Sequence, residues 1–158
     1  MAIDLSTAGI SVNYAAEATA GTRPTSGYTK LTGIKSIPEL NPAPDTLETT
    51  TLDETEYKTY IPGLKDLGGA LEFSANLTQA FMDEWEALME AYETASDDGK
   101  KVWFCIVIPG LTKSLYFPGE PTPLGMPGAE VSAVLETTAY ITATGAPIWE
   151  AKPTAVRV

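Results

Sequence analysis

The side chains most able to do chemistry in this sequence are carboxylates in one threonine-rich stretch, Glu48, Asp53, Glu54 and Glu56. Two such groups can act as the acid and base of a glycosidase, and a cluster of them can bind calcium. Their spacing matches no EF-hand loop, and the surrounding residues provide no apolar wall that would raise a carboxyl pKa. We therefore predict neither a glycosidase nor a calcium site here.

The rest of the sequence offers little other catalytic chemistry. It has no histidine, the commonest general base and transition-metal ligand, and its single cysteine cannot form a zinc cluster or an internal disulfide. The nucleophile-elbow, P-loop and dinucleotide-binding glycine motifs are also missing. The cysteine, Cys105, lies in the apolar run 102–108, where we expect a buried, inert thiol. We predict that the protein is not an enzyme and has no catalytic residue, cofactor or metal ion.

Length and composition fit one globular domain over residues 1–158. Apolar residues make up 44% of the sequence, whereas 12 prolines and 13 glycines indicate many turns. The formal net charge of −11 repels nucleic-acid phosphates and anionic membranes, so we expect no stable nucleic-acid binding and no membrane insertion. The first residues lack a secretory signal, and we expect the chain to stay in the cytoplasm that makes it.

The carboxylates lie in a ribbon of β-branched residues that we predict to be a long protruding β-hairpin loop, about residues 40–62. This ribbon buries little apolar surface, so we expect it to be mobile until a partner docks on it. The Pro-Gly pair at 62–63 and the Gly-Gly pair at 68–69 are typical of turns. Between them we expect Leu64 and Leu67 to face the core.

Strand patterns account for much of the remaining chain. Apolar and polar residues alternate over 70–77, as in a half-buried strand. The run 102–108 predicts a central strand covered on both faces. We expect a short strand at 115–117, a long alternating strand at 131–144 and a further strand within 30–40.

A change of period predicts one amphipathic helix over about residues 79–96. Asn76 or Thr78 can cap its start, and Asp97-Asp98-Gly99 ends it. Its apolar stripe consists of Phe81, Met82, Trp85, Leu88, Met89 and Tyr92.

The opposite face of this helix carries acidic residues and no basic one. Like charges four residues apart weaken a helix, so packing must compensate. Two interpretations stay open: the face is simply solvated, or it meets a basic segment such as Arg23, Lys30 or Lys35 of an adjacent subunit.

These elements predict a mainly β fold, an antiparallel β-sandwich or barrel with one flanking α-helix. Residues 31–150 would form its core. Residues 1–30 show neither helical nor strand periodicity, and we predict an extended N-terminal arm. Residues 151–158 would be a C-terminal tail.

The segments follow one another in a recognisable order. TLETTTLDETEYKTYIPGLKDLGGALEF precedes the amphipathic helix, and KVWFCIVIPGL precedes a final alternating strand that ends in AYITATG. This order resembles the major tail tube proteins of long-tailed bacteriophages and of phage-derived tailocins. The resemblance covers most of the chain from MAIDLSTAG onwards, and its most specific element is the turn Tyr60–Asp66 followed by Gly68.

The resemblance implies a structural virion protein whose hexameric rings stack into the hollow tail tube, the conduit for phage DNA into the host cell. Its implied partners are copies of itself, a tape-measure protein, a tail terminator and baseplate or initiator proteins. The implied location is the tail of the virion, after assembly in the host cytoplasm. Acidic and hydroxyl side chains along the lumen would repel the passing double-stranded DNA.

By the same resemblance, the long loop and the arm reach neighbouring subunits. The implied inter-ring or inter-subunit contact residues are Thr49, Thr51, Asp53, Glu54, Tyr57, Tyr60, Arg23 and Tyr28. The expected core and turn residues are Pro62, Gly63, Gly68, Phe73, Trp85 and Trp103.

One alternative of a different class stays open, a β-sandwich binding module that decorates a capsid or binds glycans. Such a module would present a platform of exposed aromatic residues. The tryptophans Trp85, Trp103 and Trp149 instead lie in patterns typical of a core.

Overall fold

A computed structural model describes residues 4–154 and 156–157 of the chain. The chain divides into two compact units. One unit combines the residues up to Pro38 with those from Ala70 onwards, and the other is Glu39–Gly69. Residues 1–3 of the predicted arm and residues 155 and 158 of the predicted tail lie outside the described residues.

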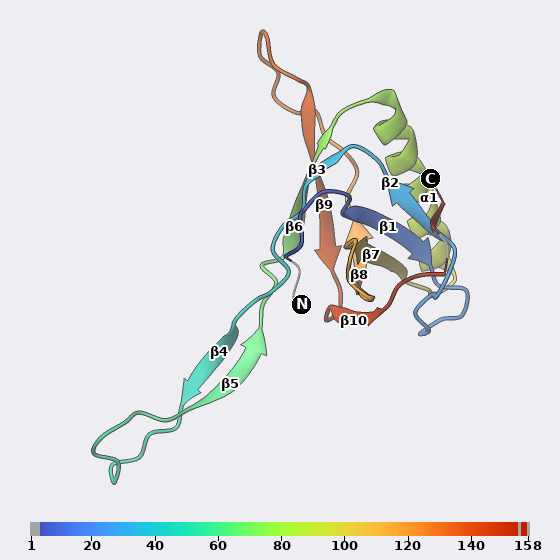
Figure 1. The fold of residues 1–158 in the computed structure, drawn as a ribbon. Coiled ribbons are helices and arrows are strands. Elements are labelled where there is room, and N and C mark those ends of the chain that lie inside the picture. Colours follow the sequence, from blue (N-terminus) through green and yellow to red (C-terminus); the bar gives the residue numbers. More distant parts are fainter. Residues whose placement is uncertain (1–3, 155, 158) are drawn as a thin grey trace. The chain divides into compact units, whose positions relative to one another are not determined.

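The larger unit is a nine-stranded, almost wholly antiparallel sheet, and the predicted mainly β fold with one helix is confirmed (Figure 1). The strand order is β11-β2-β1-β7-β8-β9-β6-β3, and β10 pairs with β8 beside this path. The strands are β1 (Ser11–Ala16), β2 (Tyr28–Leu31), β3 (Ile34–Ser36), β6 (Ala70–Asn76), β7 (Val102–Val107), β8 (Lys113–Pro121), β9 (Glu136–Ala143), β10 (Ile148–Ala151) and β11 (Val156–Arg157).

The sheet curls at β8, because this strand has two partners along one edge. Its first residues pair with β10 from Lys113 to Tyr116, and its last residues pair with β9 from Gly119 to Pro121. The other edge pairs with β7. Gly119 lies in close contact with β9, since a Cβ there would come within 2.8 Å of the Ile141 side chain.

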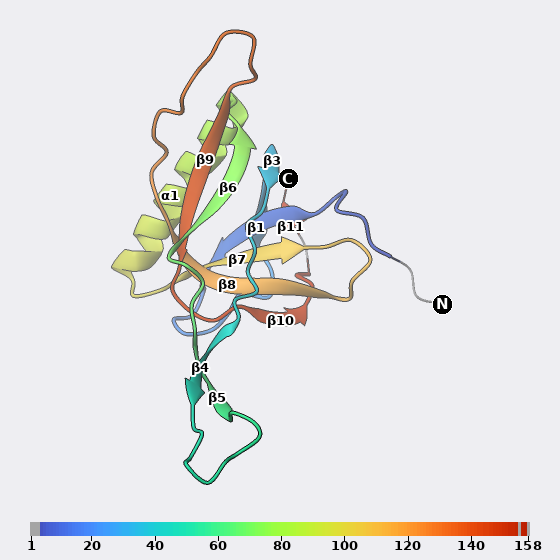
Figure 2. The same cartoon turned by 90° about the vertical axis from the view of Figure 1, so that its left-hand side faces the viewer.

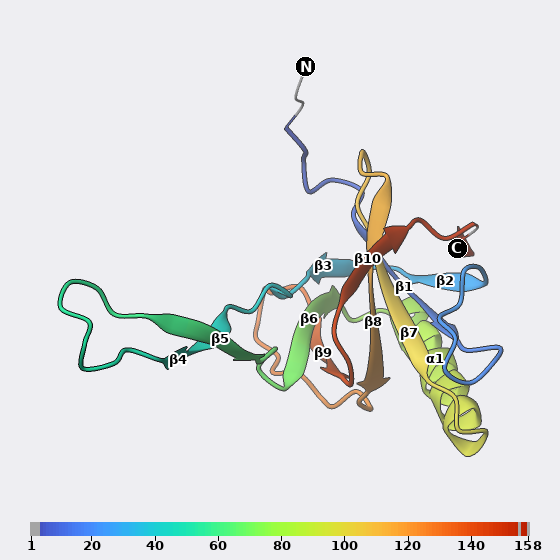
Figure 3. The ribbon, with the colours of Figure 1, turned by 90° about the horizontal axis from the view of Figure 1, so that it is seen from below.

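Helix α1 (Gln79–Asp97) packs on β1, β2, β7 and β8, and Figure 3 shows it running beside β1 and β7. The Thr78 side chain caps its start by accepting a hydrogen bond from the backbone N–H of Phe81, at 3.1 Å. Gly99, with φ of 70°, lies just after its end. The sequence therefore predicted the helix within one residue.

The helix-facing core consists of large apolar side chains. Phe81, Trp85 and Leu88 are buried on α1, and the rings of Phe104 and Phe117 stack with centroids 5.5 Å apart. The predicted half-buried strand is confirmed, since its apolar residues at positions 71, 73 and 75 are buried in β6.

The opposite face of the sheet has a smaller core of Ala15, Tyr28, Cys105 and Tyr116. Tyr28 and Tyr116 are fully buried, with ring centroids 5.7 Å apart. The predicted burial of Cys105 is confirmed, and burial raises the pKa of its thiol to about 11.

The prediction of an extended arm over residues 1–30 is wrong for the two segments that form β1 and β2. β1 lies between β2 and β7, and its side chains are mostly buried. The strand was not recognisable because a polar residue occupies one of its buried positions. Asn13 is accommodated there by donating hydrogen bonds to the Cys105 carbonyl and the Ser11 hydroxyl.

Two further strand predictions need correction. The strand expected over 131–144 begins only at Glu136, because Ser132 has a φ of 62°, a left-handed conformation that cannot continue a strand. Trp149, expected in the core, lies half-exposed on β10. Part of the predicted tail also forms strands, because β10 pairs with β8 and β11 pairs in parallel with β2.

The smaller unit is a β-hairpin of β4 (Pro44–Glu48) and β5 (Tyr60–Lys65), labelled in Figure 2. Leu47 pairs with Ile61, and Glu48 pairs with Tyr60. The predicted hairpin is thus present.

The predicted turn at Pro62-Gly63 is wrong, because both residues lie inside β5. A proline is tolerated there because each strand of a two-stranded ribbon has a free edge. Gly63 faces a close neighbour, since a Cβ would lie 3.1 Å from the Asp45 carbonyl oxygen. Gly68 and Gly69 do have the positive φ of turn glycines. Leu64, expected to face the core, is 87% exposed.

Candidate assembly surfaces

The hairpin unit carries large apolar side chains that its own residues do not cover. Tyr57 is 77% exposed, and the other exposed members are Leu47, Leu52, Tyr60, Ile61 and Leu64. Leu47 and Ile61 pair across one face of the ribbon, whereas Tyr60 pairs with Glu48 on the other. An isolated two-stranded ribbon cannot bury either face. We call these six residues the hairpin patch.

The segment between β4 and β5 is held by local hydrogen bonds. The Thr49 N–H donates to the Thr59 carbonyl at 2.8 Å, and the hydroxyls of the same two residues lie 3.0 Å apart. The Glu54 carboxylate accepts from the backbone N–H groups of Glu56 and Tyr57, and these bonds lower its pKa. Short-range bonding of this kind orders the turn without burying apolar surface.

The predicted contact residues of the hairpin are all available on its surface. Thr49 is exposed, as are Thr51, Asp53, Glu54, Tyr57 and Tyr60. Their carboxylates do not gather into a metal site, since no group of three potential metal-ligating side chains lies together in the described part of the chain. The hairpin therefore offers hydroxyl, carboxylate and apolar groups for contact with another macromolecule.

The two contact residues predicted outside the hairpin belong to the subunit's own packing. The Tyr28 hydroxyl donates to the Pro24 carbonyl at 2.9 Å, and its buried ring leaves no surface for a neighbour. The Arg23 guanidinium lies 4.1 Å from the ring centroid of Tyr116. We therefore remove Tyr28 from the contact residues. Sequence reasoning placed both residues in an arm, and their pairing with a distant strand was not visible from local pattern.

The expected core residues on the sheet and helix are confirmed in two cases of three. Phe73 and Trp85 are buried, whereas Trp103 is only partly so. The Trp103 indole N–H donates to the Glu17 carboxylate at 2.9 Å. Glu17 also accepts from the backbone N–H groups of Lys101, at 2.8 Å, and Gly21, at 3.3 Å. Burial raises the pKa of Glu17, but these donors outweigh it and hold the pKa below its usual value.

Sequence reasoning missed a second exposed apolar segment, the loop at residues 122–135 between β8 and β9. Figure 2 shows this orange segment extending beyond the start of β9. Val131 is 94% exposed, and Met126 and Val134 are also exposed. The signal was present in the sequence, because glycines and prolines at 123–128 interrupt the pattern. We read Val131 instead as part of a strand.

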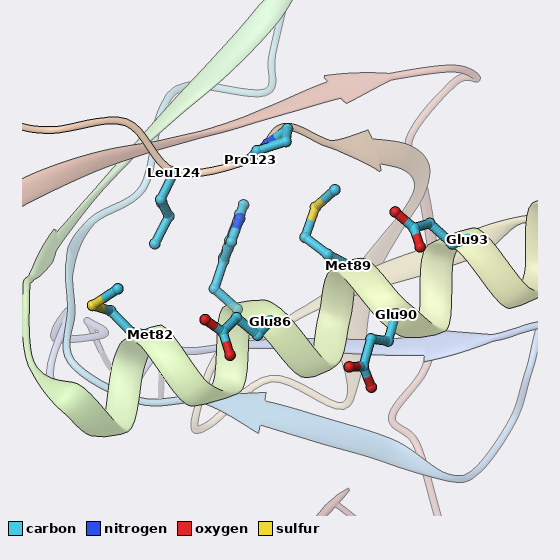
Figure 4. A pocket seen from close by; sticks show the side chains of 8 residues that line it. Met82, Glu86, Met89, Glu90, Glu93, Pro123 and Leu124 are labelled. Atoms are coloured by element: carbon cyan, nitrogen blue, oxygen red, sulfur yellow. The ribbon is translucent and has the colours of Figure 1, made fainter.

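Helix α1 has a groove beside it that the sequence also did not reveal (Figure 4). Its volume is about 380 Å³. Met82, Met89 and Leu124 form apolar walls over the buried Trp85, whose indole N–H donates to the Thr122 carbonyl at 2.9 Å. Glutamates at positions 86, 90 and 93 line the helical side.

The basic residues proposed as partners of this acidic helix are largely engaged within the subunit. Lys35 pairs with Glu136, the one ion pair among residues 4–154. Arg23 stacks on Tyr116. The Glu84 carboxylate of this helix accepts from the N–H and hydroxyl of Thr32, each at 2.8 Å.

No family model and no curated protein match this chain. In three dimensions it is similar to a chain in the cryo-EM structure of the anti-feeding prophage baseplate, six-fold symmetrised, with a TM-score of 0.63. The two share 9% sequence identity over 96% of this chain and 98% of that chain. At this identity the likeness shows a common fold. No helix within the two described stretches is long and apolar enough to cross a membrane.

Proposed function

We propose that the protein is a structural subunit of a phage tail or of a phage-derived tail-like particle, and that it forms hexameric rings which stack into a tail tube. The observation that carries this proposal is the likeness to a chain of a six-fold symmetrised phage-like baseplate. The likeness covers nearly the whole of both chains, so it includes the hairpin as well as the curled sheet. A fold alone does not fix function, and the surfaces must agree with it.

The hairpin patch supports this role. Exposed apolar residues grouped on one element are typical of surfaces that become buried on association. A contact between different surfaces of identical subunits closes into a ring, and a second such contact along the axis builds a filament. The hairpin and the loop at 122–135 supply two separate apolar elements for contacts of this kind.

The negative charge also supports a conduit for DNA. The chain carries 21 acidic and 10 basic residues. Such a surface repels phosphates and provides no tight binding site along the path of a duplex. As implied partners we retain other copies of the chain, a tape-measure protein, a terminator and baseplate or initiator proteins.

A second candidate is a baseplate ring rather than the repeating tube. The matching chain belongs to a structure described as a baseplate, and this observation favours the second role. A tube subunit repeats along an axis, whereas a baseplate ring of this type would stop after one or a few layers. Length of the assembly therefore separates the two candidates.

Negative-stain microscopy of the purified full-length chain tests the proposal. We expect six-fold rings that stack into tubes of unlimited length as concentration rises. Single rings that never stack would favour the baseplate candidate. Monomers at every concentration and salt condition, with or without initiator proteins, would overturn both. Glycan binding by such monomers would instead favour the binding module.

A further inference from the structure

We propose that the groove between α1 and the segment after β8 binds a basic, amphipathic helical segment of a different protein. Figure 4 shows Met82, Met89 and Leu124 at its apolar walls and Glu86, Glu90 and Glu93 along the helix. This inference does not depend on the proposed tube, because the groove lies outside the hairpin unit.

The walls of the groove have the properties of a peptide-binding surface. Met82 is 39% exposed although it belongs to the apolar stripe of α1. Methionine side chains are flexible and polarisable, and they adapt to varied apolar partners. The volume of about 380 Å³ falls within the range of roughly 300–1,000 Å³ that is usual for binding pockets.

The segment that forms the far wall is fixed in place. The indole of Trp85 donates to the Thr122 carbonyl and thereby anchors the chain just before Pro123 and Leu124. A proline at 123 further limits the backbone of this wall. The groove is thus formed before any partner arrives, which lowers the entropic cost of binding.

The glutamates determine the charge of the occupant. Glu86, Glu90 and Glu93 are spaced by four and three residues, so they line one side of α1. Glu86 and Glu90 repel each other, which weakens the helix until a basic partner lies beside them. Within the described residues none of the three has an ion-pair partner. Lysine or arginine residues on a bound segment would neutralise these three carboxylates.

A second copy of the chain is a poor occupant on grounds of charge. Its most exposed apolar element is the hairpin unit, and that unit is itself acidic. Its charged residues are Glu39, Asp45, Glu48, Asp53, Glu54, Glu56 and Asp66 against Lys58 and Lys65. Two acidic surfaces would repel each other. The occupant that fits is a helix with apolar residues on one face and basic residues beside them.

Fluorescence anisotropy with a labelled synthetic peptide of leucine and lysine, patterned as an amphipathic helix, tests this inference. We expect saturable binding to the full-length protein that weakens as salt rises. A peptide of the same composition with scrambled order, and one with glutamate in place of lysine, are the ligand controls. Each control peptide should bind with an affinity at least tenfold lower.

Two matched variants locate the site. E86Q/E90Q/E93Q should weaken peptide binding at least tenfold and reduce its salt dependence. D53N/E54Q/E56Q removes the same charge from the hairpin and should change binding less than twofold. A Met89→Asp variant, checked for cooperative unfolding, should also weaken binding because it makes the wall polar.

Equal losses in the two triple variants would show general charge attraction and overturn the proposal. Absence of binding by the wild-type protein would overturn it too. If E86Q/E90Q/E93Q abolished self-association while leaving peptide binding intact, the occupant would be a second copy, and the proposal would again be wrong.

Discussion

Tyrosines occur in both units of this chain, and their surroundings are opposite. Tyr28 and Tyr116 are fully buried against each other in the sheet, and the Tyr116 hydroxyl donates to the Ala151 carbonyl at 2.6 Å. Tyr57 and Tyr60 of the hairpin are largely exposed. The sheet buries these two tyrosines, whereas the hairpin leaves its two exposed. The larger unit therefore holds the buried core, and we propose that the hairpin makes the contacts with other molecules.

The largest expected effect comes from removing most of the hairpin. Replacing residues 46–59 with a short Gly-Ser turn should abolish rings and tubes in negative-stain images. The same variant should keep cooperative thermal unfolding, because these residues contribute no buried apolar side chain. Tubes of normal appearance, or loss of cooperative unfolding, would contradict this division between the two units.

The next effect concerns aromatic residues of the two units. Phe104→Ala should lower the free energy of unfolding by about 3–5 kcal/mol, because its ring is buried against Phe117. Tyr57→Ala in the hairpin should change the free energy of unfolding by less than about 0.5 kcal/mol. Urea unfolding of both variants measures the contrast, and similar losses in the two would contradict it.

Two glutamates differ in burial between the two units in the same way. Glu17→Gln should lower stability by about 1–3 kcal/mol at neutral pH, because its three N–H donors would lose a charged acceptor. Glu54→Gln changes an exposed carboxylate and should leave the urea unfolding midpoint nearly unchanged.

The stability that Glu17 contributes should also depend on pH. The pKa of Glu17 is lowered by folding, so its contribution is present above the unfolded pKa of about 4.3 and is lost as pH falls through the folded value. The stability difference between wild type and Glu17→Gln should therefore shrink below about pH 4. A difference that stays constant down to pH 2 would contradict this account.

The smallest effect on stability is expected at Leu64. Its side chain is nearly fully exposed, so Leu64→Ser should change the unfolding midpoint by an amount equivalent to less than about 0.5 kcal/mol. Assembly should nevertheless weaken, because an apolar member of the hairpin patch is lost. Sedimentation velocity would show a shift from large species to monomers at a given concentration. Unchanged sedimentation would remove Leu64 from the contact surface.

Elements with a clear repeating pattern could be predicted from the sequence. The helix was found from its apolar stripe and from Thr78, and the central strand β7 from its continuous apolar run. The hairpin was found from its β-branched residues, although the turn predicted to follow it, at Pro62-Gly63, lies inside β5. In each correct case the local pattern and the tertiary packing agree.

Features that depend on distant partners could not be predicted. β1 contains the buried Asn13, whose side-chain N–H donates to the Cys105 carbonyl far along the chain. Arg23 and Tyr28 were assigned to a neighbour because nothing local reveals their packing against Tyr116. The α1 groove likewise needs Leu124, which only the fold brings beside the helix.

Lys35 and Glu136 form the single ion pair within residues 4–154. This scarcity of ion pairs determines how the protein should respond to salt. A subunit so little held by charge pairs will keep its structure when the ionic strength is raised, since its cohesion is apolar. The same electrolyte screens the mutual repulsion of molecules that each carry a formal charge of −11. Adding salt will therefore draw the molecules together while leaving each one as firmly folded as before.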